Sequence, residues 1–166
     1  LGTGLAPNLN SVENIILKEY NGRFAEGWRI KWQAAVSAAK HIVEEFDIKQ
    51  SSIYQPVKMM SGGNIQKLLL GREIAAKPQL MVVLYPVRGL DIGAIEAVHK
   101  LLLKLKEENT AILLVSEELE ELAALADRVG VMFAGKLMGE FAVQDMDIEK
   151  IGALMAGVTD NGDEGK

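Results

Sequence analysis

Two short apolar runs, Leu80 to Tyr85 and Ala111 to Val115, are rich in Leu, Val and Ile and contain no charged residue. Such runs are typical of strands that are buried on both faces of a sheet. Between them, Asp91 can cap a helix that ends near Asn109 and carries its apolar residues on one side. Strand, helix and strand in this order predict two parallel strands of an α/β sheet.

The residues before the first run show helical patterns instead. A first helix is expected from about residue 12, and a second, amphipathic helix over residues 28–46. The second helix would place Trp28 and Trp32 four residues apart on one face. Tryptophans in this arrangement pack in a core more often than they stack on a ligand, so we expect both indoles in the core.

The residues after the second run predict a helix, a hairpin and another helix. Ser116 is expected to cap a helix whose first turn holds Glu117 and Glu118, where the helix dipole favours acidic groups. A hairpin over residues 129–143 and a short helix over about 147–156 follow.

These elements divide the sequence into four expected segments. Residues 1–78 form a loop and an α-helical subdomain, residues 79–143 a partial α/β core, and residues 144–158 a C-terminal helix. The polar and acidic residues 159–166 are expected to be a disordered tail.

The composition argues against several functions. The 166 residues carry a net charge of −5 without a long basic block, which argues against nucleic-acid binding and against a broad footprint on anionic membranes. Cysteine is absent, and His41 and His99 lack the spacing of metal ligands, so neither disulfides nor a zinc site are expected. No apolar stretch reaches the roughly 18 residues of a membrane span. The sequence begins with LGTG, without an initiator Met, and looks cut from a longer protein.

The sequence SGGN at residues 61–64 stands directly before a helix that we expect from Ile65 to Ala76. Glycines let a backbone approach a ligand closely, and a helix N-terminus offers unpaired N–H groups, so the arrangement suits a phosphate. Alone the pattern is weak evidence, because Ser-Gly-Gly before a helix is more often a turn and a cap.

Further segments follow SGGN in order: SGGNIQK at 61–67, GREIA at 71–75, PVRGLDIGA at 86–94 and VSEEL at 115–119. In order and spacing, about residues 1–157 closely resemble the nucleotide-binding domain of ABC transporters. The SGGN segment resembles the signature motif of this family, the strand ending at Tyr85 its Walker B strand, and Gly89-Leu90-Asp91 its D-loop. The sequences of the segments at 86–94 and 115–119 are most similar to the second cassette of tandem ATPases in importers of simple sugars and nucleosides.

The resemblance implies an α/β fold, namely a truncated P-loop NTPase-like core of an ABC ATPase with a mostly parallel sheet and an α-helical subdomain. In the family, two cassettes sandwich ATP head to tail, and the signature motif of one closes on nucleotide held by the other. The residues implied to act on ATP in trans are Ser61, Gly62 and Gly63 at the γ-phosphate, Asn64 and Gln66 beside them, and Asp91 across the interface.

Other family positions depart from the pattern. The 166 residues contain no Walker A sequence of the form GxxxxGK followed by Ser or Thr. Where the family has Asp and Glu at the end of its Walker B strand, this sequence has Leu84 and Tyr85. Leucine offers no oxygen to Mg²⁺, and tyrosine, with an ordinary pKa near 10, is a poor base at neutral pH. Glu117 stands at the switch-histidine position, where its alternative interpretation is a first-turn acid that complements a helix dipole.

We therefore expect that the chain binds no Mg²⁺ and does not hydrolyse ATP by itself. The resemblance implies as partners a second ATP-binding cassette and the membrane subunits of a transporter, contacted through the helical subdomain, and a place in the cytoplasm at the inner face of the cell membrane. In the family the Walker A strand lies inside the sheet, so its loss would leave an apolar strand edge. We accordingly expect a dimer or larger assembly in isolation.

Two alternatives stay open. The chain can be a non-catalytic cassette remnant that acts as an interaction or regulatory module, or an independent phosphate-binding α/β protein. The transported substrate is not encoded in these residues, because substrate choice in the family lies in other subunits.

Overall fold

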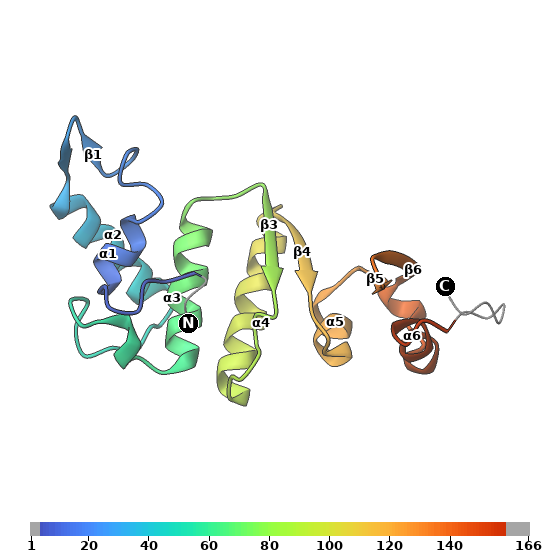
Figure 1. The fold of residues 1–166 in the computed structure, drawn as a ribbon. Helices are drawn as coiled ribbons and strands as arrows, with labels where there is room; N and C mark the ends of the chain where they lie inside the picture. The colour runs from blue at the N-terminus through green and yellow to red at the C-terminus, as the bar shows by residue number, and fades with distance from the viewer. Residues whose placement is uncertain (1–3, 159–166) are drawn as a thin grey trace. The chain divides into compact units, whose positions relative to one another are not determined.

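The computed structural model describes residues 4–158, which divide into two compact units (Figure 1). Of these described residues, the first unit contains 4–81 and 86–111, and the second contains 82–85 and 112–158. Helices and short sheets follow one another along the chain, so the predicted α/β class is confirmed. Within the described residues the strands form three two-stranded sheets. The tail predicted at residues 159–166 lies outside the described residues.

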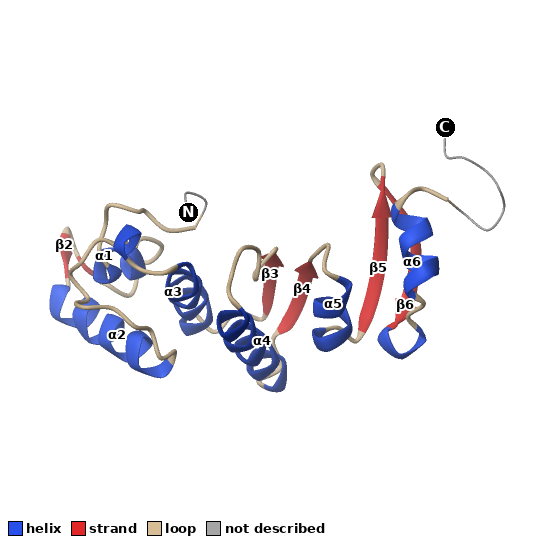
Figure 2. Ribbon diagram, turned by 90° about the horizontal axis from the view of Figure 1, so that it is seen from below, coloured by secondary structure: helices blue, strands red, loops and turns tan. Residues whose placement is uncertain are grey.

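The first unit is mainly helical, and its helices appear in blue in Figure 2. Its elements are α1 (Ser11–Ile16), β1 (Ala25–Glu26), β2 (Arg29–Ile30), α2 (Trp32–Glu45), the 3₁₀ turn η1 (Val57–Met59), α3 (Gly62–Ala75) and α4 (Ile92–Glu107). Helix α1 packs on α2, and α3 packs on both α2 and α4. The core between them is mainly aliphatic, with Phe24 and Phe46 as its aromatic members and with Ala35, Ala39 and Leu68 fully buried.

Two of these helices begin at side-chain caps. The Asn10 side chain accepts a hydrogen bond from the N–H of Glu13 at 3.0 Å, and the Glu13 carboxylate accepts one from the N–H of Asn10 at 2.8 Å. This reciprocal pair satisfies two N–H groups that the first turn of α1 leaves open. Asp91 caps α4 by accepting from the N–H of Ala94 at 2.9 Å, which confirms the predicted start of that helix.

The second helix begins four residues later than predicted. Helix α2 starts at Trp32, and the residues before it form the β1–β2 hairpin. Gly27 has a φ of +59° and turns the chain, so Trp28 lies in the hairpin turn instead of a helix. Trp28 is 88% exposed and Trp32 is 51% exposed. The prediction of a helix from residue 28 with both indoles in the core is therefore wrong, because the buried face of α2 starts only at Ala35.

A buried asparagine joins the N-terminal loop to α1. The Nδ2 atom of Asn14 donates to the carbonyls of Ala6, Leu9 and Asn10 at 3.1, 3.2 and 3.0 Å. Its Oδ1 accepts from the N–H of Ala6 at 2.7 Å, so the whole amide is satisfied although the side chain is fully buried. The carbonyl of Asn14 in turn accepts from Nη1 of Arg72 in α3 at 3.2 Å.

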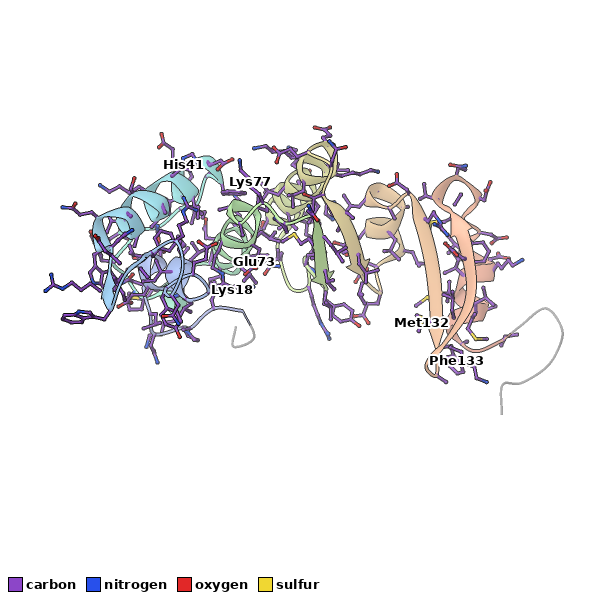
Figure 3. All side chains as sticks on the ribbon, turned by 90° about the horizontal axis from the view of Figure 1, so that it is seen from above. Lys18, His41, Glu73, Lys77, Met132 and Phe133 are labelled. Atoms are coloured by element: carbon purple, nitrogen blue, oxygen red, sulfur yellow. The ribbon has the colours of Figure 1, made fainter. Side chains whose placement is uncertain are left out.

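The ion pair of Arg72 and Glu73 on α3 is joined by Lys18 from the segment after α1. Nη2 of the buried Arg72 lies 2.7 Å from Oε1 of Glu73, and Nζ of Lys18 lies 2.6 Å from Oε2 (Figure 3). Partial burial raises the pKa of Glu73, but hydrogen bonds from Lys18 and Arg72 outweigh this effect and hold that pKa below its ordinary value. The carboxylate therefore stays ionised and balances the guanidinium charge that would otherwise be buried alone.

Strands β3 (Leu80–Leu84) and β4 (Ala111–Val115) form a two-stranded sheet. The N–H of Ala111 donates to the carbonyl of Gln79 at the beginning of the strands, and the N–H of Tyr85 donates to the carbonyl of Val115 at their ends. The two strands therefore run parallel, as predicted, and their arrows point the same way in Figure 1.

One face of this sheet is exposed, contrary to the prediction that both strands are buried on both faces. Met81 and Val83 of β3 are buried. The alternate apolar residues of the two strands are exposed by 60% at Leu80, 54% at Val82, 60% at Leu84, 56% at Leu113 and 38% at Val115. The strand pattern is that of a sheet covered on both sides, but within the described residues no element covers this second face.

The rest of the second unit is a hairpin with two helices. Its elements are α5 (Leu119–Leu125), β5 (Arg128–Phe133), β6 (Lys136–Ala142), the 3₁₀ turn η2 (Val143–Asp145) and α6 (Ile148–Met155). Strands β5 and β6 are antiparallel and turn at Ala134 and Gly135, both at positive φ. Helix α6 packs on β5 and β6 through Ile151 and Leu154. The predicted hairpin and C-terminal helix are confirmed.

Two classes of feature are absent from the part of the chain that the structure describes. Over residues 4–158, no helix is both long enough and apolar enough to cross a membrane. Over the same residues, no group of three or more His, Cys, Asp or Glu side chains is placed to hold a metal ion.

Replacing the buried amide should destabilise the first unit. Asn14→Leu keeps the side-chain size but leaves the N–H of Ala6 without its acceptor, and it removes a second donor from the carbonyls of Ala6, Leu9 and Asn10, which keep their backbone N–H partners. This change should lower the free energy of unfolding by roughly 1–3 kcal/mol. Urea denaturation followed by circular dichroism measures the change. The control is Asn8→Ala at an exposed residue that bonds only Nζ of Lys58, where we expect a change within about 0.5 kcal/mol. Equal stability of the two variants would contradict the structural role of Asn14.

Candidate functional site

The start of α3 is an open helix N-terminus. Ser61 is the N-cap, and its side chain does not bond the first-turn N–H groups. The helix begins at Gly62, not at Ile65 as predicted, so both glycines lie in the first turn, where N–H groups have no partner inside the helix. Ser61 and Gly62 are exposed. Their position offers backbone donors, a hydroxyl group and the positive end of the helix dipole to an anion.

Asn64 holds the hydroxyl group of Ser61 in place. Its Nδ2 donates to Oγ of Ser61 at 2.8 Å, and its Oδ1 accepts from the N–H of Lys49 at 2.7 Å. Because Oγ of Ser61 accepts from Asn64, the hydroxyl proton of Ser61 stays available for an outside acceptor. Asn64 thus has a supporting role that the sequence did not reveal, since Lys49 is fifteen residues away and follows no motif. Gln66 is half-buried on the same helix.

The start of α3 lies against the start of α4. A Cβ placed on Gly63 would be 2.7 Å from Cβ of Ala94, whereas one on Gly62 would be 3.5 Å from Cδ2 of Leu90, an ordinary contact. The structure therefore brings the segment at residues 61–64 next to the segment at residues 90–94. Asp91 is exposed at this position and caps α4.

The other family-like positions lie in the second unit. Leu84 is the last residue of β3, and Tyr85 follows it with a φ of +49°, a left-handed conformation that is uncommon for a bulky residue. Glu117 follows β4 and is exposed. Since the two strands are parallel, Tyr85 and Glu117 both come just after the carboxyl edge of the same sheet.

The interpretation of Glu117 as a first-turn acid is wrong. Helix α5 begins at Leu119, its N-cap is Glu118, and the acids of its first turn are Glu120 and Glu121. Ser116 does not cap the helix either, because its Oγ accepts from the N–H of Glu118 in the turn before α5. This local bond keeps Ser116 and Glu117 in the turn before α5, so the helix begins later than predicted.

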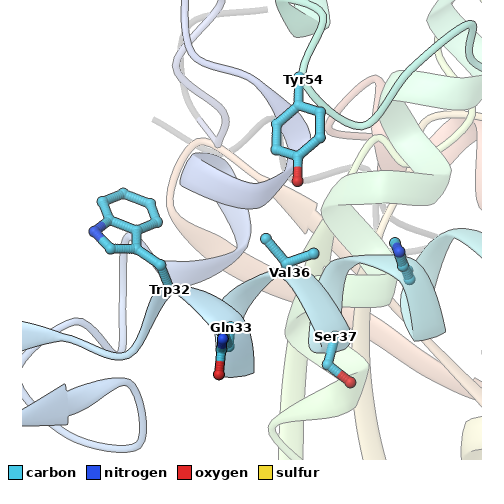
Figure 4. A pocket seen from close by; sticks show the side chains of 6 residues that line it. Trp32, Gln33, Val36, Ser37 and Tyr54 are labelled. Carbon is cyan, nitrogen blue, oxygen red and sulfur yellow. The ribbon is translucent and has the colours of Figure 1, made fainter.

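A pocket of about 450 Å³ lies on the outer side of α2 (Figure 4). Trp32 and Tyr54 stand at its rim with Val36 between them, and both aromatic rings are more than half exposed. The remaining lining residues are polar or basic: Gln33, Ser37 and Lys40. The sequence did not predict this pocket, because Tyr54 comes from the loop before α3 and only the fold places it beside α2.

The contact between α3 and α4 generates a prediction for Gly63. Gly63→Ala adds a Cβ where Ala94 leaves no room, and should destabilise the chain by about 1–3 kcal/mol. Ala94→Gly in the same chain removes the obstructing methyl group, so the double variant should be more stable than the sum of the two single effects by about 1 kcal/mol or more. Thermal and urea unfolding of the four proteins measure this coupling.

Gly152→Ala in α6 is the control for the same substitution without an obstacle. No atom lies within 4 Å of the added Cβ, so this variant should be neutral or slightly more stable. Simple additivity between Gly63→Ala and Ala94→Gly would show that the two helix starts are not in contact.

Comparisons with known proteins agree with the motifs. No model of a known protein family matches the chain. It is 36% identical over 157 residues to the guanosine import ATP-binding protein NupO of Bacillus subtilis (strain 168), covering 94% of this chain and 31% of that protein. It is also 36% identical over 157 residues to the glucose import ATP-binding protein TsgD13 of Haloferax volcanii, covering 93% of this chain and 28% of that protein. The chain thus spans about a third of the length of these curated relatives.

Solved structures show the same fold. The dimeric, post-hydrolysis structure of the ATP-binding cassette MJ0796 bound to ADP and Pi matches with a TM-score of 0.69 at 19% identity, covering 86% of this chain and 60% of that chain. MJ1267, an ATP-binding cassette of an ABC transporter, matches with a TM-score of 0.67 at 23% identity, covering 90% of this chain and 60% of that chain. The ordered motifs from residue 61 to residue 119, the import ATP-binding relatives and the cassette fold agree. The chain is part of an ATP-binding cassette of the ABC transporter family.

Proposed function

We propose that the chain is the C-terminal portion of the ATP-binding protein of an importer of simple sugars or nucleosides, and that it closes on ATP held by a partner cassette. The observation that carries this proposal is the open first turn of α3, with Ser61 and Gly62 exposed and no side chain capping the N–H groups. The names of the relatives, which are import ATP-binding proteins for guanosine, nucleosides and sugars, support the transport role.

The chemistry of this turn suits the γ-phosphate of ATP. Backbone N–H groups at a helix start and the positive end of the helix dipole stabilise negative charge. Nδ2 of Asn64 donates to Oγ of Ser61, so the hydroxyl proton of Ser61 is available to a phosphate oxygen. Glycine at positions 62 and 63 leaves no side chain between the backbone and the nucleotide. The bound ATP would supply the reactive phosphoanhydride, and these residues would orient its terminal phosphate.

The same chain is proposed not to hydrolyse ATP by itself. Phosphoryl transfer needs a carboxylate that organises Mg²⁺ and a group that orients the attacking water. Leu84 and Tyr85 stand where the family has those two acids, and a hard cation such as Mg²⁺ requires oxygen ligands. In this proposal ATP and Mg²⁺ are therefore held by the partner cassette, and Asp91 communicates between the two through the start of α4.

The proposed location is the cytoplasmic face of the cell membrane, with the helical subdomain of residues 1–78 contacting the membrane subunits. Support comes from the pocket on α2, where the exposed rings of Trp32 and Tyr54 offer apolar surface beside polar groups. A pocket with aromatic rims can accept a short helix or loop of another protein.

A second candidate function is that of a non-catalytic interaction module. The observation that favours it is the exposed face of the β3–β4 sheet, where Val82, Leu84 and Leu113 are each more than half exposed. Contiguous apolar residues on a sheet face mark association sites. The two candidates differ in whether the start of α3 matters for ATP turnover in a transporter.

Blocking the start of α3 tests the first candidate. Ser61→Arg puts a bulky side chain where the γ-phosphate would lie, so the ATPase rate of the assembled transporter should fall about 10-fold or more. The rate is measured with the variant co-expressed with its cassette partner and membrane subunits. Ser51→Arg, at an exposed serine of the preceding loop, is the control and should leave the rate unchanged. An undiminished rate with Ser61→Arg would refute the proposal.

The exposed sheet face predicts self-association of the isolated chain. We expect a dimer or larger assembly in sedimentation velocity, because apolar sheet surface recruits partners. Leu113→Glu puts a charge on this face and should raise the dissociation constant about 10-fold or more. Leu137→Glu is the control, since Leu137 is equally exposed but lies on β6. A strictly monomeric wild-type chain at high concentration would contradict the prediction.

A further inference from the structure

The β1–β2 hairpin holds a tryptophan in the open. Ala25 pairs with Ile30 and Glu26 with Arg29, and the turn between them consists of Gly27 and Trp28. Trp28 is 88% exposed, and apart from Gly27 itself and its two chain neighbours, no atom of the described residues lies within 4 Å of a Cβ built on Gly27. The hairpin tip is therefore a convex point whose largest apolar group contacts mainly solvent.

The base of the hairpin is anchored in the first unit. Phe24 is only 2% exposed and belongs to the helical core. Its carbonyl accepts from the N–H of Lys31 at 2.9 Å, which closes the hairpin next to the first turn of α2. The tip is thus presented from a fixed base, as Figure 1 shows for the β1 region at the edge of the helices.

The sequence around Trp28 carries a small excess of basic residues although the protein is acidic. Residues 19–31 contain the basic residues Arg23, Arg29 and Lys31 and the acidic residues Glu19 and Glu26, in a chain of net charge −5. The guanidinium carbon of Arg29 lies 5.0 Å from the centre of the Trp28 ring. Two further aromatic residues near the hairpin in sequence, Tyr20 and Trp32, are each 51% exposed.

We propose that the β1–β2 hairpin binds the surface of a membrane that contains anionic lipids. Indole rings prefer the interface between water and hydrocarbon, where the ring is buried and its N–H stays hydrated. Arginine and lysine beside the ring attract anionic headgroups. A protein partner would need a concave site for a single convex indole, whereas a lipid surface accepts it without a matching shape.

The net charge of −5 argues against a broad membrane footprint, so the contact is local and weak. One indole and three nearby cations give less membrane affinity than a fatty acyl chain, so we expect a binding constant on the order of 10³ M⁻¹. Such a contact would orient the helical subdomain at a membrane. It does not depend on the proposed role of α3, because no residue at 61–64 takes part.

The two tryptophans of the chain make the proposal directly measurable. Trp32→Phe leaves Trp28 as the only indole, and Trp28→Phe leaves Trp32. With phosphatidylcholine vesicles containing about 30 mol % phosphatidylglycerol, the emission of the Trp28-only chain should shift to shorter wavelength, and high salt should reverse the shift. Pure phosphatidylcholine vesicles should produce no shift.

Co-sedimentation with the same vesicles tests the residues. Trp28→Ala and Arg29→Gln should each lower the bound fraction several-fold, and both residues are exposed, so folding should be preserved and is checked by circular dichroism. Leu137→Ala and Lys136→Gln are controls at an exposed apolar residue and an exposed lysine of β6, and should bind as wild type does. Absence of sedimentation at about 1 mM anionic lipid, or a spectral shift confined to the Trp32-only chain, would overturn the proposal. Binding that requires a membrane protein in the vesicle would overturn it in favour of a protein partner.

Discussion

The start of α3 depends on one close contact, between the backbone of Gly63 and the side chain of Ala94 on α4. A side chain at position 63 would force the two helix starts to shift, since its Cβ would lie 2.7 Å from that of Ala94. The contact places the exposed Ser61 and Gly62 next to the start of α4, where a Cβ on Gly62 would touch Leu90. Glycine at position 63 is therefore required by packing inside the unit, independently of any ligand that approaches the turn.

Near this contact the chain offers hydrogen-bond donors. It lacks, at the end of β3, the two acidic residues that phosphoryl transfer needs. The first turn of α3 offers N–H groups and a serine proton that Asn64 leaves unoccupied. The end of β3 offers Leu84 and Tyr85, neither of which has a carboxylate. A protein with this set of groups can stabilise a phosphate that another protein holds, and this asymmetry underlies the proposed function.

Much of the fold followed from local patterns. The strands over 80–84 and 111–115, the Asp91 cap, the β5–β6 hairpin and the C-terminal helix lie where composition and spacing predicted them. Two helices begin later than predicted, each because of one local feature. At Gly27 a positive φ replaced a helical turn, and at Ser116 a bond to the N–H of Glu118 delayed the start of α5. One glycine or one hydroxyl group can thus decide where a helix begins, and hydrophobic periodicity does not reveal this effect.

The exposed face of β3–β4 shows the limit of such patterns from another side. Apolar residues at successive positions indicate that both faces of a strand are suited to burial, but they do not say which element provides the cover. Val82 and Leu113 are apolar, as is typical of a sheet covered on both faces, but each is more than half exposed. The pattern predicts a strand, which the structure confirms, but the exposure of that strand depends on elements outside it.

By itself, the sequence determined the type and order of the elements, the motifs that identify the family, and the lack of acids at the end of β3, because these are properties of residues close together in the chain. Only the tertiary structure decided that Gly63 meets Ala94, that Lys49 holds Asn64, and that Trp28 is exposed on a hairpin tip. Each of these depends on how segments far apart in sequence, or a turn and its surroundings, come together in space. Such contacts produce no periodic pattern in the sequence, so they become visible only in the packed structure.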